Sequence, residues 1–170
     1  MEEVEQKYTN RSVTHPVTQD PKITDQHGRS FNYLRIAVNE KCNLRCIYCM
    51  PEKGISFEPQ DKLLTCEEVN RVIQVVAKLG VNKIRFTGGE PLLRKDLVEL
   101  VKGAAETPGI DSINLTTNGI LLANSAKSLK DGGLTGVNVS IDTLEKEKYT
   151  EITRRDYIDK ACKGLSLIHI

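Results

Sequence analysis

The stretch KIRFTGGEPLLRKDLVELVKGAAETPGIDSINLTTNG, residues 83–119, decides the fold. It opens with a short predicted strand at residues 83–86 (KIRF) and contains a second one at residues 112–116 (SINLT). Between them, apolar residues recur at the helical spacing of three and four residues, until Pro108 and Gly109 end the segment. A strand, a helix and a second strand in this order form a βαβ unit. Its right-handed crossover makes the two strands parallel.

The same unit repeats on both sides of this stretch. Residues 33–38 (YLRIAV) and 137–141 (VNVSI) predict two further strands. A helix is expected after Thr65, which forms a capping-box pattern with Glu68, and another over residues 122–129. The last three strand centres are separated by about 25 to 30 residues. The pattern therefore predicts an α/β fold with a parallel sheet.

Polar and glycine residues follow the predicted strands at their carboxyl ends, the rim where (β/α) barrels gather their functional residues. We therefore expect a partial (β/α) TIM-like barrel of about four βα units, in preference to an open doubly wound sheet. A complete barrel takes about 250 residues, and this chain has 170. We expect a polar N-terminal arm over residues 1–28, an incomplete core over residues 29–163 and an anomalous tail over residues 164–170. The chain is thus expected to be a truncated N-terminal part.

The composition excludes several classes of protein. Hydrophobic residues make up 39% of the chain and charged residues 28%, as in ordinary globular proteins. No apolar stretch reaches the ~20 residues of a membrane-spanning helix, and the acidic N-terminus lacks a signal-peptide pattern. The net charge of +1 provides no basic excess for nucleic acid. We expect a cytoplasmic protein that binds a small molecule and contacts neither membranes nor nucleic acid.

Three of the five cysteines crowd into one loop after the strand at residues 33–38. Cys42, Cys46 and Cys49 have the spacing C-x3-C-x2-C, and their loop holds no fourth Cys or His. Such clustered thiols indicate metal or redox chemistry in a reducing compartment. A four-iron cluster with three protein ligands keeps one iron open for an external ligand, whereas a zinc site would need a distant fourth residue. The residues not expected to be ligands are Cys66, Cys162, His15, His27 and His169.

This cysteine loop, with Tyr48 before its last cysteine, resembles the first signature of the radical S-adenosylmethionine superfamily. The string TGGEP at residues 87–91 is similar to the second signature of that superfamily. Five strings in the same order also resemble the GTP 3′,8-cyclase family of molybdenum cofactor biosynthesis, molybdenum cofactor biosynthesis protein A. They are CNLRCIYCMP at 42–51, IRFTGGEPLLRKDL at 84–97, LTTNG at 115–119, VNVSID at 137–142 and ITRRD at 152–156.

This resemblance implies a [4Fe–4S] cluster on the three cysteines, with S-adenosylmethionine on the open iron. In that family a 5′-deoxyadenosyl radical removes the hydrogen at C3′ of GTP, and C3′ then bonds to C8 to form 3′,8-cyclo-7,8-dihydro-GTP. It also implies an electron donor such as a flavodoxin or ferredoxin. The next enzyme of the molybdopterin pathway and a second copy of the chain are further candidate partners. Members normally carry a second cluster in a C-terminal region, so we expect this chain to turn over GTP poorly.

The resemblance assigns S-adenosylmethionine contacts to Tyr48, Gly88, Gly89, Glu90 and Ser140. The two glycines have a physical reason of their own, because the absence of Cβ atoms lets the backbone approach a ligand closely. Glu90 could accept from the α-ammonium group of the cofactor. A plain strand-to-helix turn is the alternative for the glycines, a packing aromatic for Tyr48, and a satisfied strand residue for Ser140.

Arg35, Arg85 and Thr116 are the candidate GTP contacts. Both arginines lie inside apolar strands, where an unpaired guanidinium is costly to bury, so that an anionic partner such as a triphosphate is expected. Thr116 could donate to the base or the ribose. A salt bridge from either arginine to Glu40 or Glu90 is the alternative. Because the cofactor would supply the chemistry, we assign no catalytic side chain.

Three questions stay open from the sequence. Arg154 and Arg155 could help to hold phosphate or could lie in a solvated turn. The chain could be another radical S-adenosylmethionine enzyme that acts on a peptide or a different small molecule. It could also be a non-catalytic zinc-binding module in which the cysteine loop is a structural clip.

Overall fold

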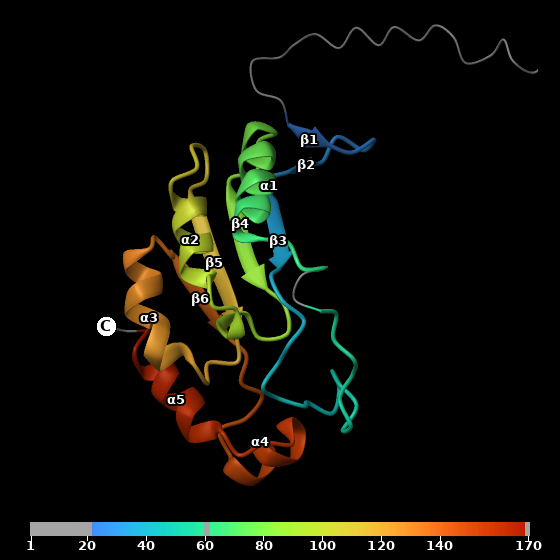
Figure 1. Ribbon diagram of the computed structural model, residues 1–170, viewed down its shortest axis with the longest axis vertical. Coiled ribbons are helices and arrows are strands. Elements are labelled where there is room, and N and C mark those ends of the chain that lie inside the picture. The colour runs from blue at the N-terminus through green and yellow to red at the C-terminus, as the bar shows by residue number, and fades with distance from the viewer. Residues whose placement is uncertain (1–21, 60–61, 169–170) are drawn as a thin grey trace, which may run out of the picture.

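The computed structural model describes residues 22–59 and 62–168, and its centre is a parallel sheet with the strand order β3-β4-β5-β6 (Figure 1). The strands of this sheet are β3 (Tyr33–Ala37), β4 (Lys83–Thr87), β5 (Ser112–Thr117) and β6 (Gly136–Val139). The helical elements are α1 (Cys66–Lys78), η3 (Pro91–Leu93), α2 (Leu97–Ala105), α3 (Leu122–Asp131), α4 (Lys146–Thr153) and α5 (Ile158–Ser166). The predicted α/β fold with parallel strands alternating with helices is confirmed.

One face of the sheet packs against the helices α1, α2 and α3. Ile84 and Phe86 on β4, and Ile113 and Leu115 on β5, are buried in a core shared with these helices. The helical residues of this core are Val69, Ile73, Leu97, Leu100, Val101, Ala104, Leu122 and Leu129. Because successive strand residues point to opposite faces, the other residues of each strand form a second face. A core on one face of the sheet is what a barrel segment requires, as we expected.

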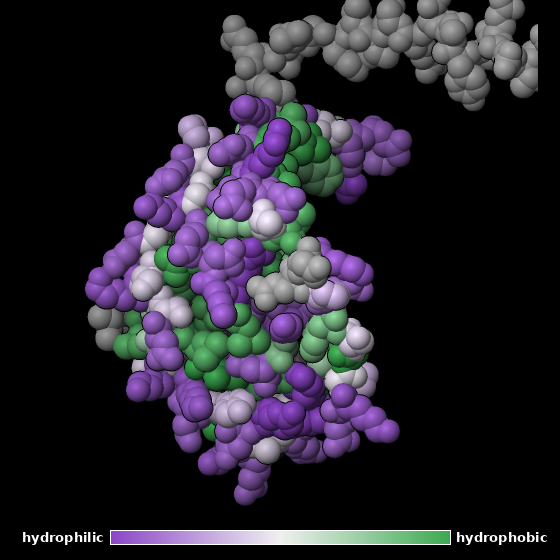
Figure 2. Space-filling model, viewed as in Figure 1, coloured by the Kyte–Doolittle hydropathy of each residue, from purple (hydrophilic) through white to green (hydrophobic). Residues whose placement is uncertain are grey.

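The helix boundaries follow the signals in the sequence. Thr65 Oγ1 accepts from the Glu68 N–H at 3.2 Å, and the Glu68 carboxylate accepts from the Thr65 N–H at 2.8 Å. These two bonds make the predicted capping box of α1. Helix α3 ends at its C-cap Gly132, also as expected. On the face of the molecule that Figure 2 shows, most side chains are hydrophilic, and apolar ones are exposed near α1 and also lower down, beside α3.

Two parts of the structure differ from the expected domain boundaries. Helix α5 continues to Ser166, so the expected tail begins inside a helix. The reason is close packing: Gly164 is buried, and a Cβ there would collide with the carbonyl oxygen of Gly119. Part of the expected arm is also ordered, since β1 (Ile23–Thr24) pairs antiparallel with β2 (Ser30–Phe31).

The remainder of the expected arm, residues 1–21 with His15, and the end of the tail with His169 lie outside the described residues. Among the helices that are described, none combines the length and apolar character needed to span a membrane.

Candidate cluster and cofactor site

The cysteine loop follows β3 and lies at the edge of the sheet where the strands end, next to α4 (Figure 1). The carbonyl oxygen of Cys46 accepts from the N–H groups of Cys49 and Met50, both at 3.0 Å, so the loop turns tightly between the last two cysteines. Cys42 and Cys46 are half-buried, whereas Cys49 is exposed. The buried apolar residues against which the first two cysteines pack are Leu44, Ile120 and Ala161.

Burial raises the pKa of both the Cys42 and the Cys46 thiol, and neighbouring acidic groups add to the shift. Because a metal takes the thiolate form, binding at these cysteines would release protons. In the parts of the chain that the structure describes, no three His, Cys, Asp or Glu side chains already form a site for a metal ion. The role of Cys42, Cys46 and Cys49 as cluster ligands therefore stays a prediction.

The glycine pair after β4 packs directly on the start of the cysteine loop. The Gly89 N–H donates to the Asn39 carbonyl at 2.9 Å, and the Glu90 N–H donates to the Lys41 carbonyl at 2.7 Å. A Cβ on Gly88 would collide with the Asn39 carbonyl oxygen, and one on Gly89 would lie only 2.5 Å from the Lys41 carbonyl oxygen. The missing Cβ atoms thus allow two loops to approach each other. Contact of this backbone with a cofactor stays a prediction.

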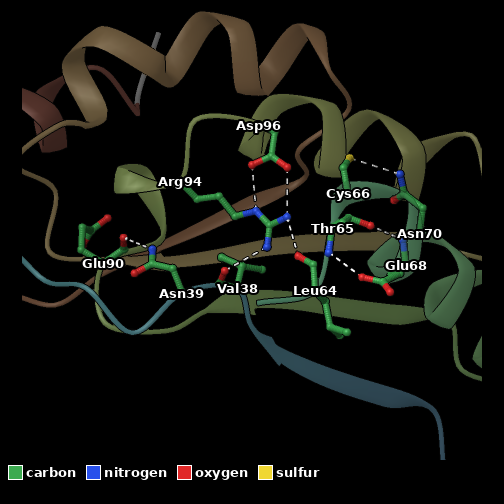
Figure 3. A network of polar contacts seen from close by, with 10 residues as sticks. All are labelled: Val38, Asn39, Leu64, Thr65, Cys66, Glu68, Asn70, Glu90, Arg94 and Asp96. Carbon is green, nitrogen blue, oxygen red and sulfur yellow. Dashed lines mark hydrogen bonds and ion pairs between the residues drawn. The ribbon is translucent and has the colours of Figure 1, made fainter. Parts of the chain in front are cut away.

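Glu90 is buried beneath these loops and already has partners for both carboxylate oxygens. One oxygen accepts from Thr117 Oγ1 at 2.6 Å and from the Leu92 N–H at 3.0 Å, and the other accepts from the Asn118 N–H at 2.8 Å. Burial raises the pKa of Glu90, against the opposing effect of these hydrogen bonds. Its own carbonyl accepts from Asn39 Nδ2 at 2.7 Å (Figure 3). The structure therefore places this carboxylate inside the protein and not at a surface open to an ammonium group.

Tyr48 and Asp142 connect the cysteine loop to the segment that follows β6. The Tyr48 hydroxyl donates to the Asp142 carboxylate at 2.9 Å. The Tyr48 residue is 68% exposed, which is incompatible with the alternative of a packing aromatic. Desolvation of the hydroxyl and its bond to Asp142 raise the pKa of Tyr48. Ser140 lies close by in the chain, exposed just after β6. Tyr48 and Ser140 were predicted as cofactor contacts, whereas Asp142 was missed although it lies in the string VNVSID.

The second face of the sheet carries the predicted GTP contacts. Arg35 on β3 is the register partner of Arg85 on β4. Arg85 Nη1 donates to Thr116 Oγ1 at 3.1 Å and to Asn138 Oδ1 at 2.6 Å. Our expectation that both arginines are buried is wrong: Arg35 is exposed and Arg85 is only half-buried, because this face of the sheet lies opposite the helices. Asn138 was missed, since a single asparagine in a strand gives no signal.

The alternative of a salt bridge for these arginines is not realised in the described residues. The Glu90 carboxylate accepts from Thr117, Leu92 and Asn118, and the Glu40 carboxylate accepts from the Glu58 N–H at 3.0 Å. Within the same residues, the Arg35 side chain makes neither a hydrogen bond nor an ion pair.

Arg94 joins three segments around the start of the cysteine loop, as Figure 3 shows. Its guanidinium donates to the Val38 and Leu64 carbonyls, both at 3.0 Å, and forms two bonds of 2.8 and 2.9 Å with the Asp96 carboxylate. The Arg94 side chain is only 10% exposed. Arg94 lies in the string IRFTGGEPLLRKDL, but its role was not predicted from the sequence. The structure shows it holding the exit of β3 in place.

A comparison with known proteins decides the family, because residues 36–169 match the family described as the Radical SAM superfamily. The chain belongs to the radical SAM superfamily. Among similar proteins, a "GTP 3′,8-cyclase" of Pelotomaculum thermopropionicum is 52% identical over 143 residues, which are 84% of this chain and 44% of that protein. "Molybdenum cofactor biosynthesis protein moc-5" of Caenorhabditis elegans is 48% identical over 147 residues, 86% of this chain and 24% of that protein. The radical SAM chain thus spans less than half the length of these relatives.

Solved structures share the fold of this radical SAM chain. Streptococcus suis SuiB has a TM-score of 0.62 at 21% identity, and the match covers 80% of this chain and 30% of SuiB. HydG, a maturase of the [FeFe]-hydrogenase, has a TM-score of 0.58 at 23% identity over 78% of this chain and 32% of HydG. These likenesses support the expected radical SAM type of barrel.

Proposed function

We propose that this chain is the cluster-binding and GTP-binding part of a GTP 3′,8-cyclase. The observation that carries the proposal is the 52% identity over 143 residues to a protein described by that activity. The packing of the cysteine loop on the Gly88–Gly89 turn supports it, since the two superfamily signatures then form one edge of the sheet.

In this proposal Cys42, Cys46 and Cys49 hold a [4Fe–4S] cluster. The donor set fits, because iron–sulfur clusters take thiolates and three ligands leave one iron open for S-adenosylmethionine. When bound, this pair of cofactors supplies a radical that removes a hydrogen atom from the substrate, with an electron from a donor such as a flavodoxin or ferredoxin. The chain itself contributes the apolar packing at Cys42 and Cys46, which keeps water away from that side of the loop.

The cofactor contacts in this proposal come from Tyr48, Ser140 and the backbone at Gly88 and Gly89. The exposed Tyr48 is held by Asp142, so its ring is oriented before any ligand arrives. Glu90 does not contact the cofactor in this proposal. Its carboxylate holds the segments that end β4 and β5 together beneath the glycines.

GTP occupies the second face of the sheet in this proposal. The planar guanidinium of Arg85 is held by Thr116 and Asn138, which orients its other donors toward an anion. Arg35, next to it in the sheet, adds a second positive charge. Two adjacent arginines favour a polyphosphate, and the positioning of substrate is the main task left to the protein.

Binding of GTP by the anaerobic protein tests this assignment. Arg35→Ala and Arg85→Ala are each expected to weaken GTP binding about tenfold or more, because each removes charge-assisted hydrogen bonds. Arg71→Ala, an exposed arginine on α1, serves as the matched control and is expected to bind like the wild type. Equal affinity in all four proteins, measured by titration calorimetry, would contradict the assignment. Because the chain is expected to turn over GTP poorly, mass spectrometry of an anaerobic GTP reaction is expected to find little cyclic product, and ready formation of that product would refute this expectation.

A further inference from the structure

The cysteine loop is bonded along its length to the end of α4, a helix distant in sequence. The N–H of Arg45 donates to the Thr153 carbonyl at 3.1 Å, and the N–H of Ile47 donates to the Ile152 carbonyl at 2.9 Å. The last turn of a helix leaves its carbonyl groups without intrahelical partners. Here two such carbonyls are satisfied by the backbone on either side of Cys46.

Arg154, at the end of α4, donates two further hydrogen bonds to the loop, whereas in the bonds above the loop is the donor. Its Nη1 donates to the Arg45 carbonyl at 3.2 Å and to the Met50 carbonyl at 3.1 Å. These two carbonyls bracket the segment that carries Cys46 and Cys49. Within the described residues Arg154 has no carboxylate within ion-pair distance, so its charge is directed at the loop backbone. The sequence left open whether Arg154 holds phosphate or lies in a solvated turn; in the structure its side chain donates to the backbone of the cysteine loop.

The backbone of Arg154 is as unusual as its contacts. It is the C-cap of α4 and has a φ of 55°, the one non-glycine residue with a positive φ among those that the structure describes. Glycine is the usual residue in this left-handed conformation. Arg154 therefore has a strained backbone conformation, and its guanidinium lies against the loop.

The last turn of α4 is itself buried at Tyr149 and Thr153. Tyr149 is 2% exposed, and its carbonyl accepts from Thr153 Oγ1 at 2.7 Å. The end of α4 is thus a buried support for the loop and not a solvated turn.

We propose that Arg154 is a positioning residue for the cluster: it holds the backbone of residues 45–50 so that Cys46 and Cys49 present their sulfur atoms together. This inference rests on the proposed cluster-binding function and deepens it. It gives the string ITRRD at residues 152–156 a structural role, since Arg154 in this string holds the cysteine loop.

Arg154→Gly and Arg154→Lys separate the guanidinium from the backbone conformation. Glycine adopts the left-handed conformation without strain, so Arg154→Gly is expected to fold while losing both bonds to the loop. Lysine keeps the charge but lacks the planar fork of donors, so Arg154→Lys is expected to retain part of the function. Arg71→Gln, on the exposed face of α1, is the control for loss of an arginine.

Hydrogen–deuterium exchange of the metal-free protein gives the first measurement. Peptides covering residues 44–50 are expected to exchange about tenfold faster in Arg154→Gly, which corresponds to loss of about one charge-assisted hydrogen bond. Arg154→Lys is expected to lie between this variant and the wild type, with Arg71→Gln at the wild-type rate. Wild-type exchange in Arg154→Gly would overturn the proposal.

Loss of iron from the reconstituted protein to a chelator gives the second measurement, expected to be about tenfold faster in Arg154→Gly, with partial rescue in Arg154→Lys. Equal iron loss in the wild type and Arg154→Gly would also overturn the proposal. If the wild type takes up no iron, the proposed function fails instead, while the exchange experiment still decides the role of Arg154 at the loop.

Discussion

Single residues in this chain hold loops together where the sequence suggested contact with ligands. Gly88 and Gly89 are glycines because the backbone of Asn39 and Lys41 leaves no room for a Cβ. Glu90 is acidic because three donors converge on it beneath the same loops. The sequence reveals residue types that suit a cofactor site, but the same types also suit the tight junction between two loops. Only the structure shows which of these residues form a junction between two loops.

The buried Glu90 predicts a specific dependence of stability on pH. Its pKa is raised in the folded protein, so the folded state holds a proton that the unfolded state has released. The free energy of unfolding of the wild type is therefore expected to rise, relative to Glu90→Gln, as the pH falls from neutrality through the raised pKa. The relative gain is expected to level off below the ordinary value of about 4.5, where both states are protonated.

Urea unfolding of the metal-free wild type and Glu90→Gln at a series of pH values measures this difference. The comparison cancels the other titrating groups that the two proteins share. A difference that stays constant across the range would show that Glu90 has the same pKa in the folded and unfolded states.

At the scale of elements, strong local signals predicted the structure well. The strands of the parallel sheet and helices α1 to α3 form where the apolar spacing, the capping box and the glycines place them. Helices α4 and α5 were missed. Helix α5 has apolar residues at the helical spacing, Ile158, Ala161, Cys162 and Leu165, a signal that was available but was hidden by reading the end of the chain as an anomalous tail. Helix α4 is held by bonds to a distant loop, which no local pattern reveals.

The capping box of α1 allows a test of one such local signal. Thr65→Ala removes the acceptor for the Glu68 N–H and is expected to lower the free energy of unfolding by about 1 kcal/mol. Thr65→Ser keeps a hydroxyl at the same position and is expected to stay within about 0.5 kcal/mol of the wild type. Urea denaturation followed by circular dichroism measures both. Equal losses in the two variants would show that the hydroxyl is not the stabilising group.

At the scale of the whole molecule, the sheet separates a stabilising face from a polar one. The face toward the helices holds the apolar core, and the other carries Arg35, Arg85, Thr116 and Asn138. This division was predictable from alternation along the strands. The role of α4 as a support for the cysteine loop was not, because it depends on contacts between segments about a hundred residues apart.

The central claim is that the loop of Cys42, Cys46 and Cys49 binds a [4Fe–4S] cluster with one iron open. Low-temperature electron paramagnetic resonance of the anaerobically reconstituted, dithionite-reduced protein tests it most directly. We predict a cluster signal whose shape changes when S-adenosylmethionine is added, and which is lost in a Cys46→Ala variant. A protein that remains colourless and silent, or a signal indifferent to both S-adenosylmethionine and Cys46, would contradict the claim.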